Sequence, residues 1–123
     1  MGLRSVTVAL LAVVACASPN NSGSTNPLSG DAMAASQGEK LFASMNCDGC
    51  HGGGALGFAA PSLVDGRWRY GGEDSSLFRS IAAGRPRGMP AYGPMLADGT
   101  IWQLVTYLRS QPVPNAVPTQ AWP

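Results

Sequence analysis

Two cysteines and the only histidine of the chain stand together, in the order Cys47-Asp48-Gly49-Cys50-His51. Thiols three residues apart lie on one side of a turn, where both can add to the two vinyl groups of one porphyrin. This run is the attachment signature of a c-type haem. The adjacent imidazole then lies beneath the iron and offers a ring nitrogen as an axial ligand. The sequence therefore predicts one haem c, bound covalently through Cys47 and Cys50 and ligated by His51.

Three other kinds of site use cysteines at this spacing. A structural disulfide accounts for the two cysteines but leaves His51 unexplained. A thioredoxin-like redox pair belongs to a βαβ unit, and no strand is predicted before residue 47. A zinc site needs four ligands, which a chain with one His and no second Cys pair cannot supply alone. Each alternative explains fewer of the residues than haem does.

The second axial ligand of the iron is sought among the methionines. Because His51 is the only His, ligation by two histidines of one molecule is impossible. The soft ligands that remain beyond the start of the chain are Met33, Met45, Met89 and Met95. Met45 is too close to Cys47 to reach the opposite face of a porphyrin. Met33 lies on the first predicted helix, where we expect it to pack or to face solvent.

Met89 stands in a loop that is suited to hold a ligand. Gly88 before it permits an unusual backbone angle, and Pro90 after it stiffens the chain. Met89 is therefore the predicted ligand, with Met95 as the fallback. Either side chain could instead belong to an ordinary core.

Three helices are predicted to position these residues. Apolar residues recur at spacings of three and four over residues 32–45, 74–83 and 100–110. Asp31 is available as the N-cap of the first helix, Gly84 ends the second, and Pro112 ends the third. Residues 52–69 and 85–98 are rich in Gly and Pro and are expected to form loops. No stretch alternates long enough to predict a sheet, so the expected fold class is all-α.

In these motifs the chain resembles the class I cytochromes c, a family of small monohaem electron carriers. The resemblance covers residues 37–109: Gly38 and Phe42 in the first helix, the CDGCH site, the APSL and GMPAY segments, and the last helix WQLVTYLR. It implies an all-α fold in which the N- and C-terminal helices cross and loops line a haem slot.

The resemblance also implies roles for single residues. Gly38 and Phe42 would pack against the last helix, at Trp102, Val105 and Tyr107. The carbonyl of Pro61 would accept the ring N–H of His51, fixing the ring and raising its basicity as a ligand. Trp68, Tyr70 or nearby arginines would bind the haem propionates, and we name Trp68 as a cofactor-binding residue.

The start of the chain predicts export from the cytoplasm. One cation followed by an apolar run makes residues 1–15 an export signal, too short to cross a hydrocarbon core. Val13-Val14-Ala15-Cys16 resembles a bacterial lipobox, so we expect a lipoprotein anchored in a membrane through Cys16. Cleavage after Ala17 is the alternative and would release a soluble periplasmic protein.

The domain boundaries follow from these signals. Residues 16–30 are predicted to be a linker that begins at the lipidated cysteine. Residues 18–30 contain one aliphatic side chain among thirteen, which predicts a flexible segment. The cytochrome c domain is predicted over 31–111, and 112–123 is a Pro-rich tail. The expected location is the bacterial periplasm.

Composition limits both the partners and the core. A formal net charge of +1 excludes the basic footprint of a protein that binds nucleic acid. With 12% charged residues, 16 Gly and 10 Pro in 123 residues, a large self-sufficient core is doubtful. A covalently held porphyrin would supply the missing apolar surface.

These predictions together favour an electron carrier over an enzyme. With protein ligands in both axial positions, the iron has no open site for a small-molecule substrate, and it would cycle between Fe(II) and Fe(III) among respiratory or dehydrogenase partners. Arg85 and Arg87 beside the methionine loop could attract an acidic partner, although a solvated face or propionate pairing explains them equally well. One alternative function is a fixed haem subunit of a membrane-associated dehydrogenase or terminal oxidase. Another is a haem sensor or peroxidase in which Met89 dissociates.

Overall fold

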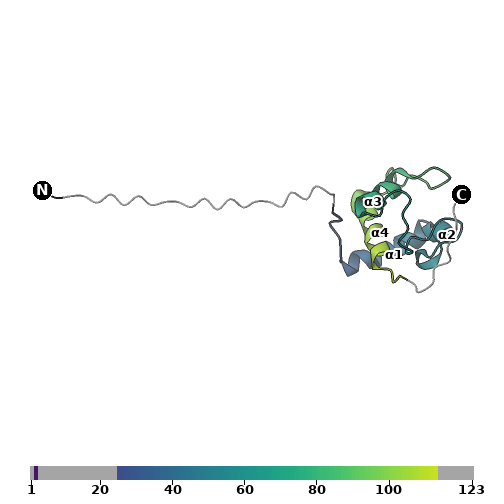
Figure 1. Ribbon diagram of the computed structural model, residues 1–123, viewed down its shortest axis with the longest axis horizontal. Coiled ribbons are helices and arrows are strands. Elements are labelled where there is room, and N and C mark those ends of the chain that lie inside the picture. Colours follow the sequence, from purple (N-terminus) through teal and green to yellow (C-terminus); the bar gives the residue numbers. More distant parts are fainter. Residues whose placement is uncertain (1, 3–24, 114–123) are drawn as a thin grey trace.

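The computed structural model describes residue 2 and residues 25–113, and this part of the chain is helical (Figure 1). Its elements are α1 (Ala32–Ser44), α2 (Cys47–His51), the 3-10 helix η1 (Gly53–Ala55), α3 (Asp74–Ala83) and α4 (Asp98–Ser110). The described residues form no strand, only an isolated bridge between Arg85 and Met89. The all-α prediction is confirmed. Among the helices described, none has the length and apolar character needed to cross a membrane.

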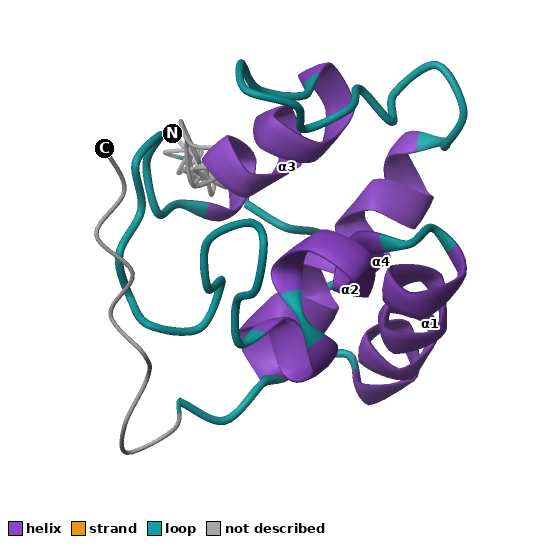
Figure 2. Ribbon diagram, turned by 90° about the vertical axis from the view of Figure 1, so that its right-hand side faces the viewer, coloured by secondary structure: helices purple, strands orange, loops and turns teal. Residues whose placement is uncertain are grey.

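Helices α1 and α4 pack directly on each other, as Figure 2 shows. The close approach depends on Gly38, since a Cβ placed there would lie 2.1 Å from the backbone oxygen of Gln103. One turn further along α1, the ring of Phe42 packs against that of Tyr107, with centroids 5.3 Å apart. The expected contact of Gly38 and Phe42 with the last helix is therefore present at Tyr107.

Trp102 has a different neighbour from the one that the resemblance implied. Its ring lies 4.5 Å from that of Phe78 on α3, centroid to centroid. Helix α4 thus separates two aromatic pairs, one facing α1 and one facing α3. The large side chains that are most completely buried, Ile101, Leu104 and Val105, all belong to α4.

The helix ends agree with the capping residues seen in the sequence. The Asp31 carboxylate accepts hydrogen bonds from the backbone N–H groups of Met33 and Ala34, at 2.8 and 3.1 Å. Gly84 ends α3 with a φ of +69°. Helix α4 begins at Asp98, two residues before the predicted start.

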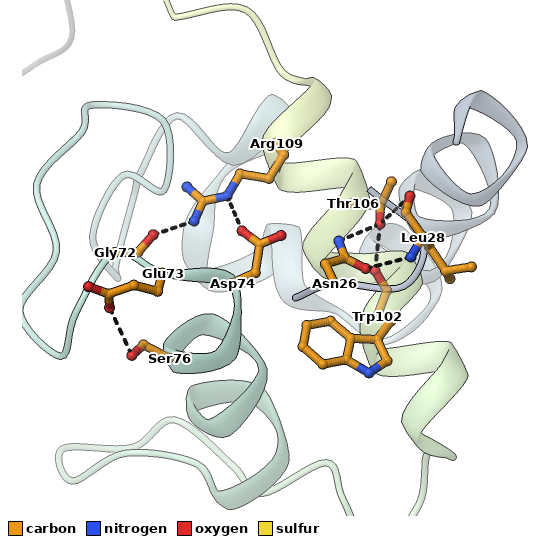
Figure 3. Close-up of polar contacts among 9 residues, drawn as sticks. All are labelled: Asn26, Leu28, Gly72, Glu73, Asp74, Ser76, Trp102, Thr106 and Arg109. Carbon is orange, nitrogen blue, oxygen red and sulfur yellow. Dashed lines mark hydrogen bonds and ion pairs between the residues drawn. The ribbon is translucent and has the colours of Figure 1, made fainter. Parts of the chain in front are cut away.

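Residues 25–30, which we expected to belong to the linker, lie against α4. Asn26 is 6% exposed, and its side-chain amide donates to the Thr106 hydroxyl at 2.9 Å (Figure 3). The Asn26 side-chain oxygen accepts from the N–H of Leu28, and Thr106 in turn donates to the backbone oxygens of Leu28 and Trp102. We call residues 25–30 with Thr106 the N-terminal clasp.

A second polar contact joins the loop before α3 to the end of α4. The Arg109 guanidinium forms an ion pair with Asp74 at 2.7 Å and donates to the backbone oxygen of Gly72 (Figure 3). It also lies over the ring of Trp68, 5.5 Å from the centroid. This contact fixes the segment that carries Trp68.

Candidate haem-binding site

The two thiols of the site lie on the five-residue helix α2. Asn46 precedes it in the left-handed conformation, with a φ of 58°, which turns the chain sharply after α1. Both cysteines are free thiols, Cys47 half-buried and Cys50 exposed. Burial, with a smaller contribution from Asp48, raises the pKa of the Cys47 thiol. The structure thus contains no disulfide between them, and both sulfurs are available for covalent attachment.

One ring nitrogen of His51 is held by the backbone. The Nδ1 atom lies 2.8 Å from the carbonyl oxygen of Pro61. Because a carbonyl can only accept, this pairing assigns the proton to Nδ1 and leaves Nε2 with a lone pair. Burial lowers the pKa of His51, and the bond to Pro61 opposes that shift. A neutral, oriented imidazole with Nε2 free is the form that ligates iron.

The loop after His51 is tied back onto α2 by backbone hydrogen bonds. Gly57 donates to the oxygen of His51 at 2.6 Å, and Ala60 donates to that of Cys50 at 2.8 Å. Ala55 is completely buried inside the loop, and its oxygen accepts from Leu63. These bonds bring Pro61 back beside the histidine from ten positions along the chain.

Met89 closes a tight turn that follows α3. The N–H of Arg85 donates to the Met89 oxygen at 3.1 Å, and Gly88 has the unusual backbone angle that the sequence suggested, with a φ of +107°. A Cβ at Gly84 would lie 2.6 Å from the same Met89 oxygen, so the turn requires glycine there. The Met89 side chain is half-buried and packs against the core.

Tyr92 joins this turn to the end of α1, just before the cysteine helix, a role that we did not predict. Its hydroxyl donates to the backbone oxygen of Met45 at 3.3 Å, and its N–H donates to Ile81. Burial, followed by the nearby Cys47, raises the pKa of the Tyr92 phenol. The GMPAY segment showed an aromatic residue with a polar tip after the methionine, but nothing in the sequence marked a partner 47 residues away.

The other candidate residues lie outside the contacts around His51 and Met89 described above. Met33 and Met95 are 73% and 63% exposed, so neither packs into the domain as Met89 does. Trp68 is half-buried and lines a cavity of about 140 Å³ with Leu108 and Val113. No residue from α2 lines that cavity. Cys16 lies outside the described residues.

The site therefore fits a covalently attached haem in the chemistry of its donors. Two free thiols and one oriented imidazole stand within five residues on α2. A methionine turn is joined through Tyr92 to Met45 at the end of α1, two residues before Cys47. Within the described residues, no three side chains of His, Cys, Asp or Glu gather as a separate metal site.

A family model described as cytochrome c oxidase, cbb3-type, subunit III, matches residues 33–108. The chain belongs to this family of c-type cytochromes. The match spans α1 to α4 and contains every site residue named above except Cys16. This c-type cytochrome is a haem c protein, and the spacing of Cys47 and Cys50 fits covalent attachment.

Curated relatives and solved structures agree with the family. The chain is 39% identical over 94 residues to the cbb3-type cytochrome c oxidase subunit CcoP of Azospirillum brasilense, covering 71% of this chain and 32% of the relative. It is 39% identical over 84 residues to FixP of Azorhizobium caulinodans, covering 66% and 28%. The chain thus spans about a third of the length of these relatives.

Cytochrome cL of Methylophaga aminisulfidivorans has a similar fold. The TM-score is 0.67 at 31% identity, over 72% of this chain and 62% of that one. Cytochrome cL of Hyphomicrobium denitrificans matches with a TM-score of 0.58 at 29% identity, over 62% and 46%. The small class I cytochrome c fold is therefore confirmed.

Proposed function

We propose that this cytochrome carries single electrons between protein partners, with His51 and Met89 as the two protein ligands of its iron. When bound, the haem supplies an iron that changes its charge by one unit. The observation that carries the proposal is the hydrogen bond from Tyr92 to Met45, because it ties the methionine turn to the end of α1, two residues before Cys47.

The residues around the iron would each have a limited task. Cys47 and Cys50 would hold the porphyrin, Pro61 would keep the His51 ring in one orientation, and Met89 would supply the second protein ligand of the iron. Since thioether ligation favours reduced iron, a Met/His pair raises the reduction potential. With His51 and Met89 both bound, the iron would have no position for a substrate, which supports a carrier and not a catalyst. We also propose that Trp68 binds a haem propionate.

Replacing Met89 with Ala tests the ligand assignment. The far-red absorption band of a ferric thioether ligand should disappear, and the reduced protein should bind carbon monoxide, while the haem stays attached through both cysteines. Met95→Ala is the matched control and should keep the band. If Met95→Ala loses the band and Met89→Ala keeps it, the ligand is Met95. Carbon monoxide binding by the unaltered protein would support the sensor or peroxidase alternative.

The family match favours a second function, that of a fixed haem subunit in a terminal oxidase complex. The relatives CcoP and FixP are named as subunits of cbb3-type oxidases. Purification in mild detergent separates the two functions. A companion protein in constant stoichiometry would establish the subunit, and a monodisperse single chain would support the free carrier.

We further propose that the protein works in the bacterial periplasm, anchored through a lipid on Cys16. Support comes from the lipobox-like segment and from covalent haem attachment of this kind, which is made outside the bacterial cytoplasm. Cys16→Ala should leave the haem spectrum intact and release the protein from membranes into the soluble fraction. Continued membrane association would contradict the anchor.

A further inference from the structure

The side chain of Arg85 connects the methionine turn, residues 85–89, to two other parts of the domain. Its Nε donates to the hydroxyl of Ser80 on α3 at 3.0 Å, and its guanidinium lies over the ring of Tyr70, 4.2 Å from the centroid. Its backbone N–H donates to the oxygen of Met89 and so closes the turn. The same residue therefore begins the turn and attaches it to its surroundings.

The two ends of the methionine turn are held by different kinds of contact. After the turn, the N–H groups of Tyr92 and Gly93 donate to backbone oxygens of α3 at 3.0 and 2.9 Å. Before it, the contacts to Ser80 and Tyr70 are made by the side chain of Arg85. Backbone bonds persist when side chains are changed, whereas the contacts of Arg85 can be removed by substitution. The position of the first half of the turn therefore depends on one side chain.

Tyr70 belongs to a segment that is itself held by α4. Arg109 donates to the backbone oxygen of Gly72 and lies over the ring of Trp68, 5.5 Å from the centroid. Gly72 also packs closely on this ring, since a Cβ there would lie 2.6 Å from its Cδ1 atom. Tyr70 stands between these two residues in the chain. Its ring is therefore a fixed support for the Arg85 guanidinium.

Both contacts of Arg85 are of kinds that stabilise a structure measurably. A cation within about 6 Å of a ring centroid is attracted by the face of the ring, and a guanidinium stacks there because it is weakly hydrated. A hydrogen bond from a charged donor, such as that to Ser80, is stronger than one between neutral groups. Loss of either contact should increase the fraction of molecules in which the methionine turn is displaced.

We propose that Arg85, supported by the ring of Tyr70, is a positioning residue that keeps Met89 in place as an iron ligand. The inference rests on the proposed ligation by Met89. Because the thioether can stay on the iron only while the turn is in place, the two side chains limit how often the axial position opens to another molecule. Pairing of Arg85 with a haem propionate is the competing explanation, and under it the Tyr70 ring would have no effect on the ligand.

Imidazole binding to the ferric, haem-loaded protein measures this opening. Imidazole takes the axial position only after Met89 has left, so its apparent affinity rises in proportion to the fraction of open molecules. The titration is followed by the loss of the far-red band. Arg85→Gln removes both side-chain contacts and should raise the affinity about tenfold. Tyr70→Leu removes the ring contact alone and should raise it about two- to fivefold.

A double-mutant cycle tests whether the two residues act through each other. Arg85→Gln combined with Tyr70→Leu should raise the imidazole affinity no more than Arg85→Gln does alone, because the ring contact is then already lost. Independent effects would instead multiply to about 20- to 50-fold. Tyr70→Phe keeps the face of the ring and should leave the affinity unchanged.

Two controls separate positioning from charge and from general stability. Arg69→Gln removes a guanidinium from the same Tyr70 ring, but Arg69 lies 5.9 Å from the centroid and outside the methionine turn. It should change the affinity less than about twofold. Asn26→Ala weakens the fold at the N-terminal clasp, and it should lower the temperature of global unfolding without changing the imidazole affinity.

Four results would overturn the inference. An unchanged affinity in Tyr70→Leu would show that Arg85 acts without the ring, as propionate pairing requires. Multiplied effects in the double variant would show that the two residues act separately. An equal rise in Arg69→Gln would assign the effect to charge, and an equal rise in Asn26→Ala would assign it to stability. Failure of the proposed ligation would look different, because the far-red band would then be absent from the unaltered protein or would survive Met89→Ala.

Discussion

His51 and Tyr92 show how single polar contacts arrange the site. The imidazole is oriented by a carbonyl ten residues away, and the phenol connects the methionine turn with the end of α1, just before the cysteine helix. Identification of the attachment residues required only their spacing, since CxxCH is a local pattern. The Tyr92 contact depends on how α1 and the last loop come together, which local sequence does not encode.

Tyr92→Phe should loosen the methionine turn without unfolding the domain. Loss of one partly buried hydrogen bond costs about 0.5–1.5 kcal/mol of unfolding free energy. The far-red band should therefore disappear at a lower temperature than in the unaltered protein, while the haem remains attached. Tyr70→Phe is the control, because the Tyr70 ring contacts arginines through its face and its hydroxyl forms no bond to the described residues. If the band disappeared at the same temperature in both variants, the role of Tyr92 would be contradicted.

The helices show where prediction from periodicity succeeds and where it stops. Apolar spacing located α1, α3 and α4 to within two residues, because each helix is at least ten residues long and so shows its period. Helix α2 and η1 were expected as turn and loop, since five and three residues are too few to show a period. The N-terminal clasp was expected as linker, because its composition is polar and its stability comes from Thr106, 80 positions away.

Gly38→Ala should separate α1 from α4. A methyl group 2.1 Å from the Gln103 oxygen meets backbone, which cannot rotate away, so the helices must move apart. We expect a loss of about 3 kcal/mol or more in the free energy of unfolding, measured by denaturant titration of the haem protein. Gly99→Ala is the matched control on α4, where a Cβ meets nothing within 4 Å. It should stabilise slightly, by about 0.5–1 kcal/mol, because alanine favours the helix. Equal stability of the two variants would show that the helices tolerate the methyl group.

Asn26→Ala should weaken the N-terminal clasp. Removing a buried amide leaves the Thr106 hydroxyl with one partner fewer and costs about 1–3 kcal/mol of unfolding free energy. Hydrogen exchange at the Leu28 amide should become faster, since that N–H bonds to the Asn26 side chain. Ser29→Ala, at an exposed neighbouring position, should change neither quantity. A stability equal to that of the unaltered protein would mean that the clasp adds nothing to the fold.

The domain is small, and much of it consists of loops. Its most completely buried large side chains come from one helix, and the rest of the core is shared among short elements and glycine-rich segments. A body of this size buries only about 60% of the surface that its unfolded chain exposes. The low core content seen in the composition therefore persists in the structure, and the porphyrin has a structural task as well as a chemical one.

Replacing both Cys47 and Cys50 with Ser should produce a chain that folds poorly. Without covalent attachment the haem is lost, and binding energy that stabilises only the folded state is lost with it. We expect no cooperative thermal transition in the near-ultraviolet circular dichroism of this variant. Cys16→Ser should retain the transition, because it leaves the attachment site intact. A cooperative transition in the double variant would show that the chain supports its own core.

The N-terminal clasp also determines how far an anchored domain could travel. Because folded structure begins by residue 25, only nine peptide steps separate Thr25 from Cys16, and even fully extended they span about 30 Å. A lipid on Cys16 would confine the carrier to a thin layer beside the bilayer, where it meets its partners by lateral diffusion. Such a short arm suits exchange with proteins embedded in the same membrane and excludes shuttling across a wide compartment.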